Sequence, residues 1–177
     1  MARVFRTLAL SAIAAAALVA RPAAQTASIQ ADFLKDVQAQ KDMLVKIAEA
    51  MPESKFSFKA TPAERSYGEQ IMHIAQVNVM LVKTLGAKTP APAINMKAMS
   101  KADTIKAMSD SFDYAVAVVK EQTDQTMVGT IQGPPWMGPS TRARMIEFLI
   151  GHTQDIYGQM VVYLRLNGLV PPASQRP

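Results

Sequence analysis

A regular repeat near the carboxyl end constrains the fold of this chain more than any other feature. Residues between positions 145 and 166 recur at alternating spacings of four and three, a rhythm typical of a helix that turns one face toward partner helices. They are Met145, Leu149, His152, Ile156, Gln159, Tyr163 and Leu166. The repeat predicts a helix from Ser140 or Thr141 to about residue 166, with His152 and Ile156 facing inward. Asn167-Gly168 is the expected stop signal.

Three earlier segments carry comparable apolar stripes and end signals. The first runs from about residue 29 to residue 50, ahead of Pro52. The second begins at Ser66, with Glu69 placed to complete a capping box, and stops at Gly86. The third begins at Ser100 and fades near residue 123. Four such helices predict an all-α fold, most simply a four-helix bundle, while the long loops between them leave the packing order open.

The first residues have the plan of a secretory signal peptide. A short basic start is followed by an apolar run from Leu8 to Ala20, which is shorter than the roughly 20 residues that a membrane-spanning helix needs. We expect a signal peptide over residues 1–27 and a single domain over residues 28–177. The mature protein is then exported, periplasmic or extracellular, without a stable membrane span; an uncleaved anchor is the alternative.

Charge and cysteine content narrow the classes of partner. The formal charge of +5 includes three arginines of the leader, and without them only about +2 remains. Nucleic acid is therefore not an expected partner. Because the chain has no cysteine, it must be stabilised by packing alone in an oxidising compartment.

Two histidines are the main candidates for chemistry. His152 lies on the last predicted helix and His73 on the second, where His73, Val77 and Met80 share one face. Neutral imidazole is a common ligand of divalent transition metals, and a carboxylate would have to supply a third ligand. Asp155, three residues after His152, and Glu69, four before His73, have suitable helical spacing. Equally, the histidines are explained as core residues hydrogen-bonded to Gln70 or Gln159.

At these residues the sequence resembles the DinB/YfiT-like four-helix proteins. The resemblance covers nearly all of the predicted domain, from DFLKDVQAQKDMLVKIAEAMPESKFSFKATPAERSYGEQIMHIA to GHTQDIYGQMVVYLRLNGLVPPAS. It implies a four-helix bundle, often a homodimer, that holds a divalent metal (Zn, Ni or Mn) with three histidines. His73 and His152 match two of these, but the third position, four residues after His152, is Ile156.

The resemblance leaves several hypotheses of function. The first is an exported metal-binding protein with His73, His152 and Asp155 as ligands and with hydrolase or transferase activity, in which the metal activates water or a thiol. Its alternative is a metal-free bundle that binds an unidentified small molecule between the second and last helices, or a partner protein. The single Trp136 is expected either to cover the mouth of that pocket or to pack on the bundle end. The twelve methionines are expected to fill the core.

Overall fold

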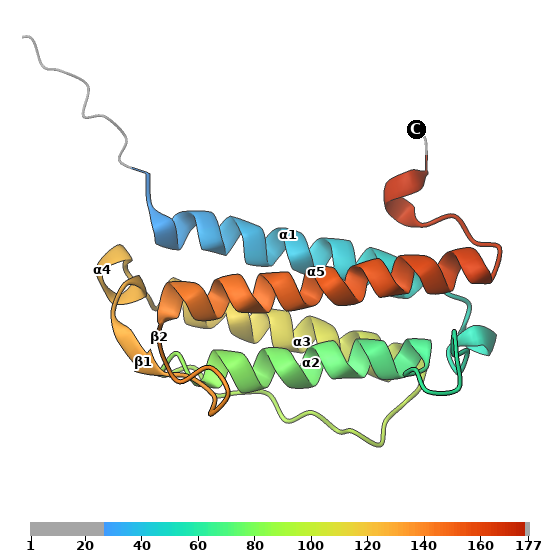
Figure 1. Ribbon diagram of the computed structural model, residues 1–177, viewed down its shortest axis with the longest axis horizontal. Coiled ribbons are helices and arrows are strands. Elements are labelled where there is room, and N and C mark those ends of the chain that lie inside the picture. Colours follow the sequence, from blue (N-terminus) through green and yellow to red (C-terminus); the bar gives the residue numbers. More distant parts are fainter. Residues whose placement is uncertain (1–26, 176–177) are drawn as a thin grey trace, which may run out of the picture.

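The computed structural model of the protein describes residues 27–175. Four long helices form a bundle, and short elements close its ends (Figure 1). The predicted domain, residues 28–177, therefore lies almost wholly within the described part of the chain. The predicted signal peptide lies outside it, apart from residue 27.

The four long helices begin and end close to the predicted positions. Helix α1 spans Ile29–Ala50, α2 Tyr67–Lys83, α3 Lys101–Lys120 and α5 Arg142–Leu166. The side chain of Ser66 accepts a hydrogen bond from the backbone N–H of Glu69, whose carboxylate accepts one from the N–H of Ser66. This is the predicted capping box, which provides acceptors for two N–H groups at the start of α2. Gly168 adopts a left-handed φ of 73° just after α5, as the Asn167-Gly168 signal indicated.

The helices pack in the ring order α1, α3, α2, α5, with α1 and α5 running one way and α2 and α3 the other (Figure 1). Asn78 of α2 hydrogen-bonds Ser111 of α3, and Glu121 at the end of α3 accepts from the backbone N–H of Lys88 and Thr89. The contact with Glu121 lies later in the sequence than the Asn78–Ser111 contact on both sides, so α2 and α3 are parallel. Residues 84–100 therefore run back along the whole bundle as a crossover, which decides the connectivity that the loop lengths left open.

Short elements that the sequence patterns did not predict close one end of the bundle. Helix α4, Asp124–Met127, leads into strand β1, Thr130–Gln132, which pairs antiparallel with β2, Pro139–Thr141. The side chain of Arg142 donates to the carbonyls of Leu85 and Thr126 and so ties the hairpin to the ends of α2 and α4. Two 3-10 turns, Glu53–Lys55 (η1) and Pro172–Ser174 (η2), complete the described elements.

The core is aliphatic and aromatic, as expected, but the predicted inward faces are corrected near the end of α5 and on α2. Met145, Leu149, Ile156 and Tyr163 are buried, whereas Leu166 is 58% exposed. A straight helix turns slightly more slowly per residue than a strict heptad repeat requires, so Leu166 has drifted off the buried face near the end of α5, where Leu164 is buried instead.

A similar rotation affects the predicted face of α2. Met80 is 44% exposed, and His73 is half-buried at the α2–α5 edge instead of pointing into the centre. None of the helices within residues 27–175 is both long and apolar enough to cross a membrane.

Candidate functional site

The two histidines predicted from the sequence meet at the edge between α2 and α5. The Nε2 atoms of His73 and His152 are 3.2 Å apart, within hydrogen-bonding distance. Their ring centroids are separated by 5.1 Å and their planes are inclined by 64°. These two antiparallel helices thus bring together residues that are far apart in the sequence.

The second ring nitrogen of His152 determines which tautomer suits the pair. Its Nδ1 is buried and has no hydrogen-bond partner in the described part of the chain. A buried N–H group without an acceptor costs about 1–3 kcal/mol. An unprotonated Nδ1, which leaves only a lone pair without a donor, costs less. The favoured arrangement therefore places the proton of His152 on Nε2, which donates to Nε2 of His73.

The surroundings of the pair keep both rings neutral. Burial lowers the pKa of His73 to about 4, and the charges of Arg65 and His152 act in the same direction. Burial also lowers the pKa of His152; Asp155 opposes that shift and Arg65 adds to it. At pH 7 the pair is a polar, uncharged group beside the positive charge of Arg65.

The glutamines do not bond to the histidines. Gln70 donates to Oε1 of Gln159 over 2.7 Å, and Gln159 donates to a carboxylate oxygen of Asp155 over 2.9 Å. The expectation of core histidines bonded to Gln70 or Gln159 is therefore corrected, because each histidine has the other as its partner.

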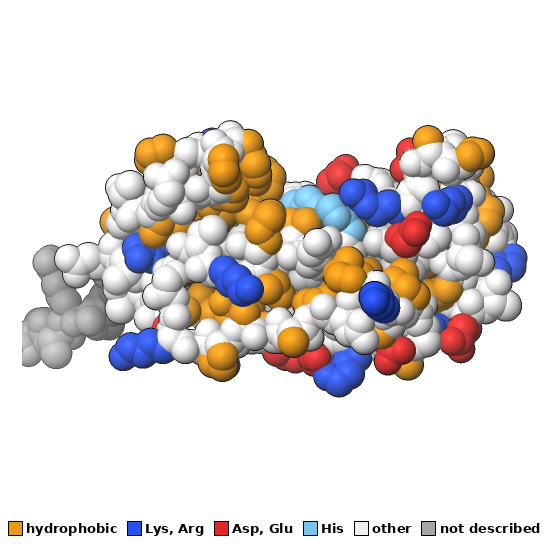
Figure 2. Space-filling view, turned by 90° about the horizontal axis from the view of Figure 1, so that it is seen from below, with side chains coloured by type: hydrophobic (Ala, Val, Ile, Leu, Met, Phe, Trp, Pro, Cys, Tyr) orange, Lys and Arg blue, Asp and Glu red, His pale blue; other side chains and the backbone are white. Residues whose placement is uncertain are grey.

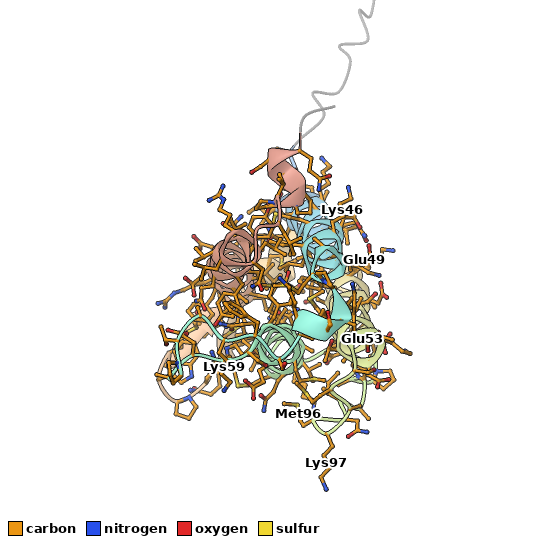
Figure 3. The ribbon with its side chains drawn as sticks, turned by 90° about the vertical axis from the view of Figure 1, so that its right-hand side faces the viewer. Lys46, Glu49, Glu53, Lys59, Met96 and Lys97 are labelled. Carbon is orange, nitrogen blue, oxygen red and sulfur yellow. The ribbon has the colours of Figure 1, made fainter. Side chains whose placement is uncertain are left out.

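Two open grooves flank the histidine pair. The α5 groove has a volume of about 540 Å³ and is lined by Arg144, Glu147, Phe148, Gly151, His152 and Asp155. The α2 groove has a volume of about 580 Å³ and is lined by Lys59, Ala63, Glu64, Arg65, Glu69, Met72, His73, Gln76, Met96 and Met99. Figure 2 shows the pale-blue histidines in a depression between two raised parts of the surface, with hydrophobic side chains gathered on the left one. Figure 3, a view along the bundle, shows Lys59 and Met96 on different sides of α2.

Comparison with known proteins identifies the family. The family model described as the DinB superfamily matches residues 36–160, more than half of the chain. The chain belongs to the DinB superfamily. No curated protein sequence matches it.

Two solved DinB-like proteins share the fold. One from Bacillus cereus superposes with a TM-score of 0.72 at 20% sequence identity, over 82% of this chain and 96% of its own. One from Bacillus subtilis gives a TM-score of 0.62 at 15% identity, over 82% of this chain and 99% of its own. These similarities confirm the predicted helical DinB-like fold.

The residues of this DinB domain fit a three-histidine metal centre poorly. Within residues 27–175 no three His, Asp or Glu side chains gather closely enough to hold a metal ion. Ile156, at the position of the expected third histidine, is 2% exposed and packs in the core. With both Nε2 atoms bound to a metal, the buried Nδ1 of His152 would carry a proton and lack the acceptor that ligating histidines usually have.

The remaining candidates have other roles. Glu69 caps α2 and forms an ion pair with Lys59 across 3.4 Å, as its capping-box spacing indicated. Asp155 lies in the α5 groove with His152, and its carboxylate is held by Gln159. Of the predicted ligands, the structure joins His73 and His152 directly and leaves Asp155 beside them.

The sequence patterns singled out Trp136 but not Phe148, which lines the α5 groove. Trp136, in the β1–β2 loop, contacts Phe148 of α5 with ring centroids 5.0 Å apart and ring planes inclined by 47°, although the two side chains are 59% and 39% exposed. Trp136 thus lies against the helix beside the groove and is not buried at the bundle end. Phe148, one turn before His152, was the available signal, but a helix of this composition offers several apolar residues at that spacing.

Proposed function

We propose that this DinB-family protein is a metal-free binding bundle that takes a small organic molecule with an aromatic ring in the α5 groove. The observation that carries the proposal is the hydrogen-bonded, neutral His73–His152 pair at the edge of that groove. Uncharged imidazoles provide a fixed polar contact without requiring a metal. The groove volume lies within the 300–1,000 Å³ that is usual for small-molecule sites.

The aromatic residues support a ring-shaped ligand. Phe148 lines the groove together with His152, and Trp136 contacts Phe148 from the β1–β2 loop. Exposed aromatic side chains that touch one another are available to stack on a further ring, an interaction worth about 0.5–1.5 kcal/mol beyond the buried area. Arg144 and Asp155 at the groove offer both signs of charge for the polar part of the molecule. In this proposal the protein binds its ligand after export, and no bond is made or broken.

Trp136 reports directly on binding because it is the only tryptophan of the chain. The probe is 8-anilinonaphthalene-1-sulfonate, and the measurement is its fluorescence enhancement together with quenching of Trp136. We expect saturable binding that Phe148→Ala weakens about tenfold, since one well-placed aromatic contact contributes on the order of 1 kcal/mol. Val162→Ala is the matched control, because Val162 is exposed on α5 but is not part of the groove. Equal affinities in the Phe148→Ala variant and the wild type would contradict the proposal.

A second candidate is a divalent metal site formed by His73, His152 and Asp155. It is favoured by the 3.2 Å separation of the Nε2 atoms, which matches two nitrogens each about 2.0–2.1 Å from one ion. Hydrolase or transferase activity would belong to this candidate, since it needs an ion to activate water or a thiol.

Elemental analysis of untagged protein, beside the variants Ile156→His and His73→Ala, separates the two candidates. Near-stoichiometric Zn, Ni or Mn in the wild type, lost in His73→Ala, would replace the first proposal by the second. Metal in the Ile156→His variant alone would support the metal-free bundle and show that the scaffold still accepts a third ligand. Ile150→His is the control for a new histidine elsewhere on α5.

A further inference from the structure

The histidine pair leaves one N–H group free for a ligand. Since Nε2 of His73 accepts the proton of His152, a neutral His73 carries its own proton on Nδ1. This Nδ1 has no hydrogen-bond partner among residues 27–175, and unlike Nδ1 of His152 it is not buried. His73 lines the α2 groove, so the accessible side of its ring suits a hydrogen-bond acceptor and not a cation.

Arg65 provides a second donor in the same groove. Its side chain is exposed, and its guanidinium forms no ion pair or hydrogen bond in the described part of the chain. The backbone of Arg65 is fixed relative to α5, because its carbonyl accepts a bond from the hydroxyl of Tyr163 over 2.6 Å. Besides burial, which is the main cause, the charge of Arg65 lowers the pKa of both histidines, as a guanidinium near the two rings would. Figure 2 shows basic and acidic side chains directly beside the pale-blue histidines.

The charges of the groove favour a ligand with a single negative charge. Lys59 is paired with Glu69 across 3.4 Å, which leaves Glu64 and Arg65 as the other charged side chains of the lining. Glu64 repels an anion, and it repels a doubly charged phosphate twice as strongly as a carboxylate at the same distance. A carboxylate also matches the planar fork of a guanidinium. A carboxylate is therefore the group that these donors fit best.

Methionines give the groove an apolar part that the expectation of core filling does not explain. Met108 and Met160 are fully buried and fill the core as predicted, whereas Met96 and Met99, on the crossover, are 46% and 39% exposed. Both exposed side chains line the α2 groove, as does the nearly buried Met72. Because methionine side chains are flexible, they adapt to an apolar chain without a fixed geometry. The lining thus combines hydrogen-bond donors with adaptable apolar surface.

We propose that the α2 groove binds a small carboxylate with an alkyl chain. The carboxylate accepts hydrogen bonds from Arg65 and from the Nδ1–H of His73, and the chain lies against Met96 and Met99. The site rests on the neutral, metal-free histidine pair of the proposed function, but it is separate from the groove of the aromatic ligand. Each histidine then serves a different groove, since His73 lines the α2 groove and His152 the α5 groove.

Isothermal titration calorimetry of the untagged protein with octanoate at pH 7 tests the proposal, with octylamine as the probe of opposite charge. We expect one equivalent of octanoate to bind and octylamine to bind at least about tenfold more weakly, since a cation finds donors and a guanidinium where it needs acceptors. Arg65→Gln should weaken octanoate binding about tenfold, through loss of a charge-assisted hydrogen bond. Arg165→Gln is the matched control, because Arg165 is exposed on α5 but lies outside the groove.

Nitrogen NMR of the imidazoles gives a readout that a structural role of Arg65 would not produce. The chain has only two histidines, so His73→Gln assigns both rings. We expect the proton of His73 on Nδ1 and that of His152 on Nε2, and we expect octanoate to shift the Nδ1 resonance of His73 in the wild type but not in Arg65→Gln.

Three results would overturn the proposal: equal affinities for octanoate and octylamine, an octanoate affinity that Arg65→Gln leaves unchanged, or a proton of His73 on Nε2. The last result would leave the proposed function intact, because the pair would still be neutral and hydrogen-bonded. Binding of the fluorescent probe in the α5 groove should be the same in Arg65→Gln and the wild type, so the two proposals fail separately.

Discussion

His152 shows how one side chain can be constrained differently at its two ring atoms. Its Nε2 lies within hydrogen-bonding distance of Nε2 of His73, while its Nδ1 is buried and has no partner among residues 27–175. Ile156, one turn further along α5, closes the site from the core side. The pair is therefore most stable when both rings are neutral and hydrogen-bonded to each other. A pair that binds a metal would also need an acceptor for the proton on Nδ1 of His152.

Protonation of His73 should lower stability on the acid side of neutrality. Its pKa is 6.5 in the unfolded chain and about 4 in the folded protein, so the unfolded state binds more protons between these values. The free energy of unfolding should thus rise with pH through this window. Since His73 is only half-buried, solvent screening reduces the effect to on the order of 1 kcal/mol.

Urea denaturation of the wild type and of His73→Gln at pH 7 and pH 5 measures this effect. The variant should lose less stability between the two pH values. The measured range from pH 5 to pH 7 lies above the ordinary pKa of 4.5 of Glu69 and Glu121, and the pKa of both is lowered further, so these carboxylates contribute little to the difference. An equal loss in both proteins would show that His73 is not the group that titrates.

Rare residue types with a specific chemistry could be recognised from the sequence as candidates for the site, whereas common apolar residues could not. His73 and His152 stand out because the chain has only two histidines, and helical spacing predicted that they face inward from two separate helices. Phe148 and Met96 were not singled out, since apolar side chains are common and their exposure depends on tertiary packing. Asp155 was found by spacing, but spacing does not show that Gln159 holds its carboxylate.

Among the elements, those with side-chain caps were the predictable ones. Ser66 and Ser100 each accept a bond from the backbone N–H three residues on, which fixes where α2 and α3 begin. The β1–β2 hairpin has three-residue strands, too short for an alternation of apolar and polar residues to appear. Local hydrogen-bonding signals thus identify the helices, whereas the hairpin depends on contacts such as those of Arg142.

Residues 59–65, which supply part of the lining of the α2 groove, are attached to α5 by a hydrogen bond. The hydroxyl of Tyr163 in α5 donates to the carbonyl of Arg65 over 2.6 Å. We expect Tyr163→Phe to destabilise the protein by about 1 kcal/mol, the net contribution of a typical buried hydrogen bond. Residues 59–65 should also exchange their amide hydrogens faster, because the segment then has one fewer attachment.

Hydrogen exchange followed by mass spectrometry, with denaturation in urea, tests both effects. Tyr157→Phe serves as the control, since its hydroxyl makes no hydrogen bond in the described part of the chain. If both variants behave alike, the bond to Arg65 does not hold this segment in place.

At the scale of the whole molecule, connectivity was the property that the sequence left undetermined. Loops of moderate length can either turn between antiparallel neighbours or return along a bundle. Here α2 and α3 are parallel, with residues 84–100 extending from one end of the bundle to the other (Figure 1). Contacts between helices, such as the hydrogen bond from Asn78 to Ser111, determine this parallel arrangement. The preferences of single residues do not reveal such contacts.

The length of the crossover should set a sharp limit on deletion. Helix α3 has 20 residues and is therefore about 30 Å long, a distance that nine fully extended residues barely cover. Deleting residues 91–94 leaves about 13 residues in the crossover and should give a folded protein. Deleting residues 91–98 leaves about nine and should prevent the parallel arrangement.

Circular dichroism with thermal melting compares the two deletions. We expect a cooperative transition for the shorter deletion and a loss of cooperativity, or a change in oligomeric state, for the longer one. A cooperative monomer from the longer deletion would mean that the helices can pack in another order.

The crossover has a consequence for how such a protein can acquire a new specificity. A bundle with two parallel neighbouring helices must include a returning segment of chain. Here residues 84–100 pass along the α2 groove, which His73 also lines, and Glu121 accepts hydrogen bonds near the start of the segment. Its exposed residues carry little of the packing, so they can be exchanged without remodelling the helices. Selection can therefore alter what the protein recognises by substituting exposed residues of the crossover, without any change in the core.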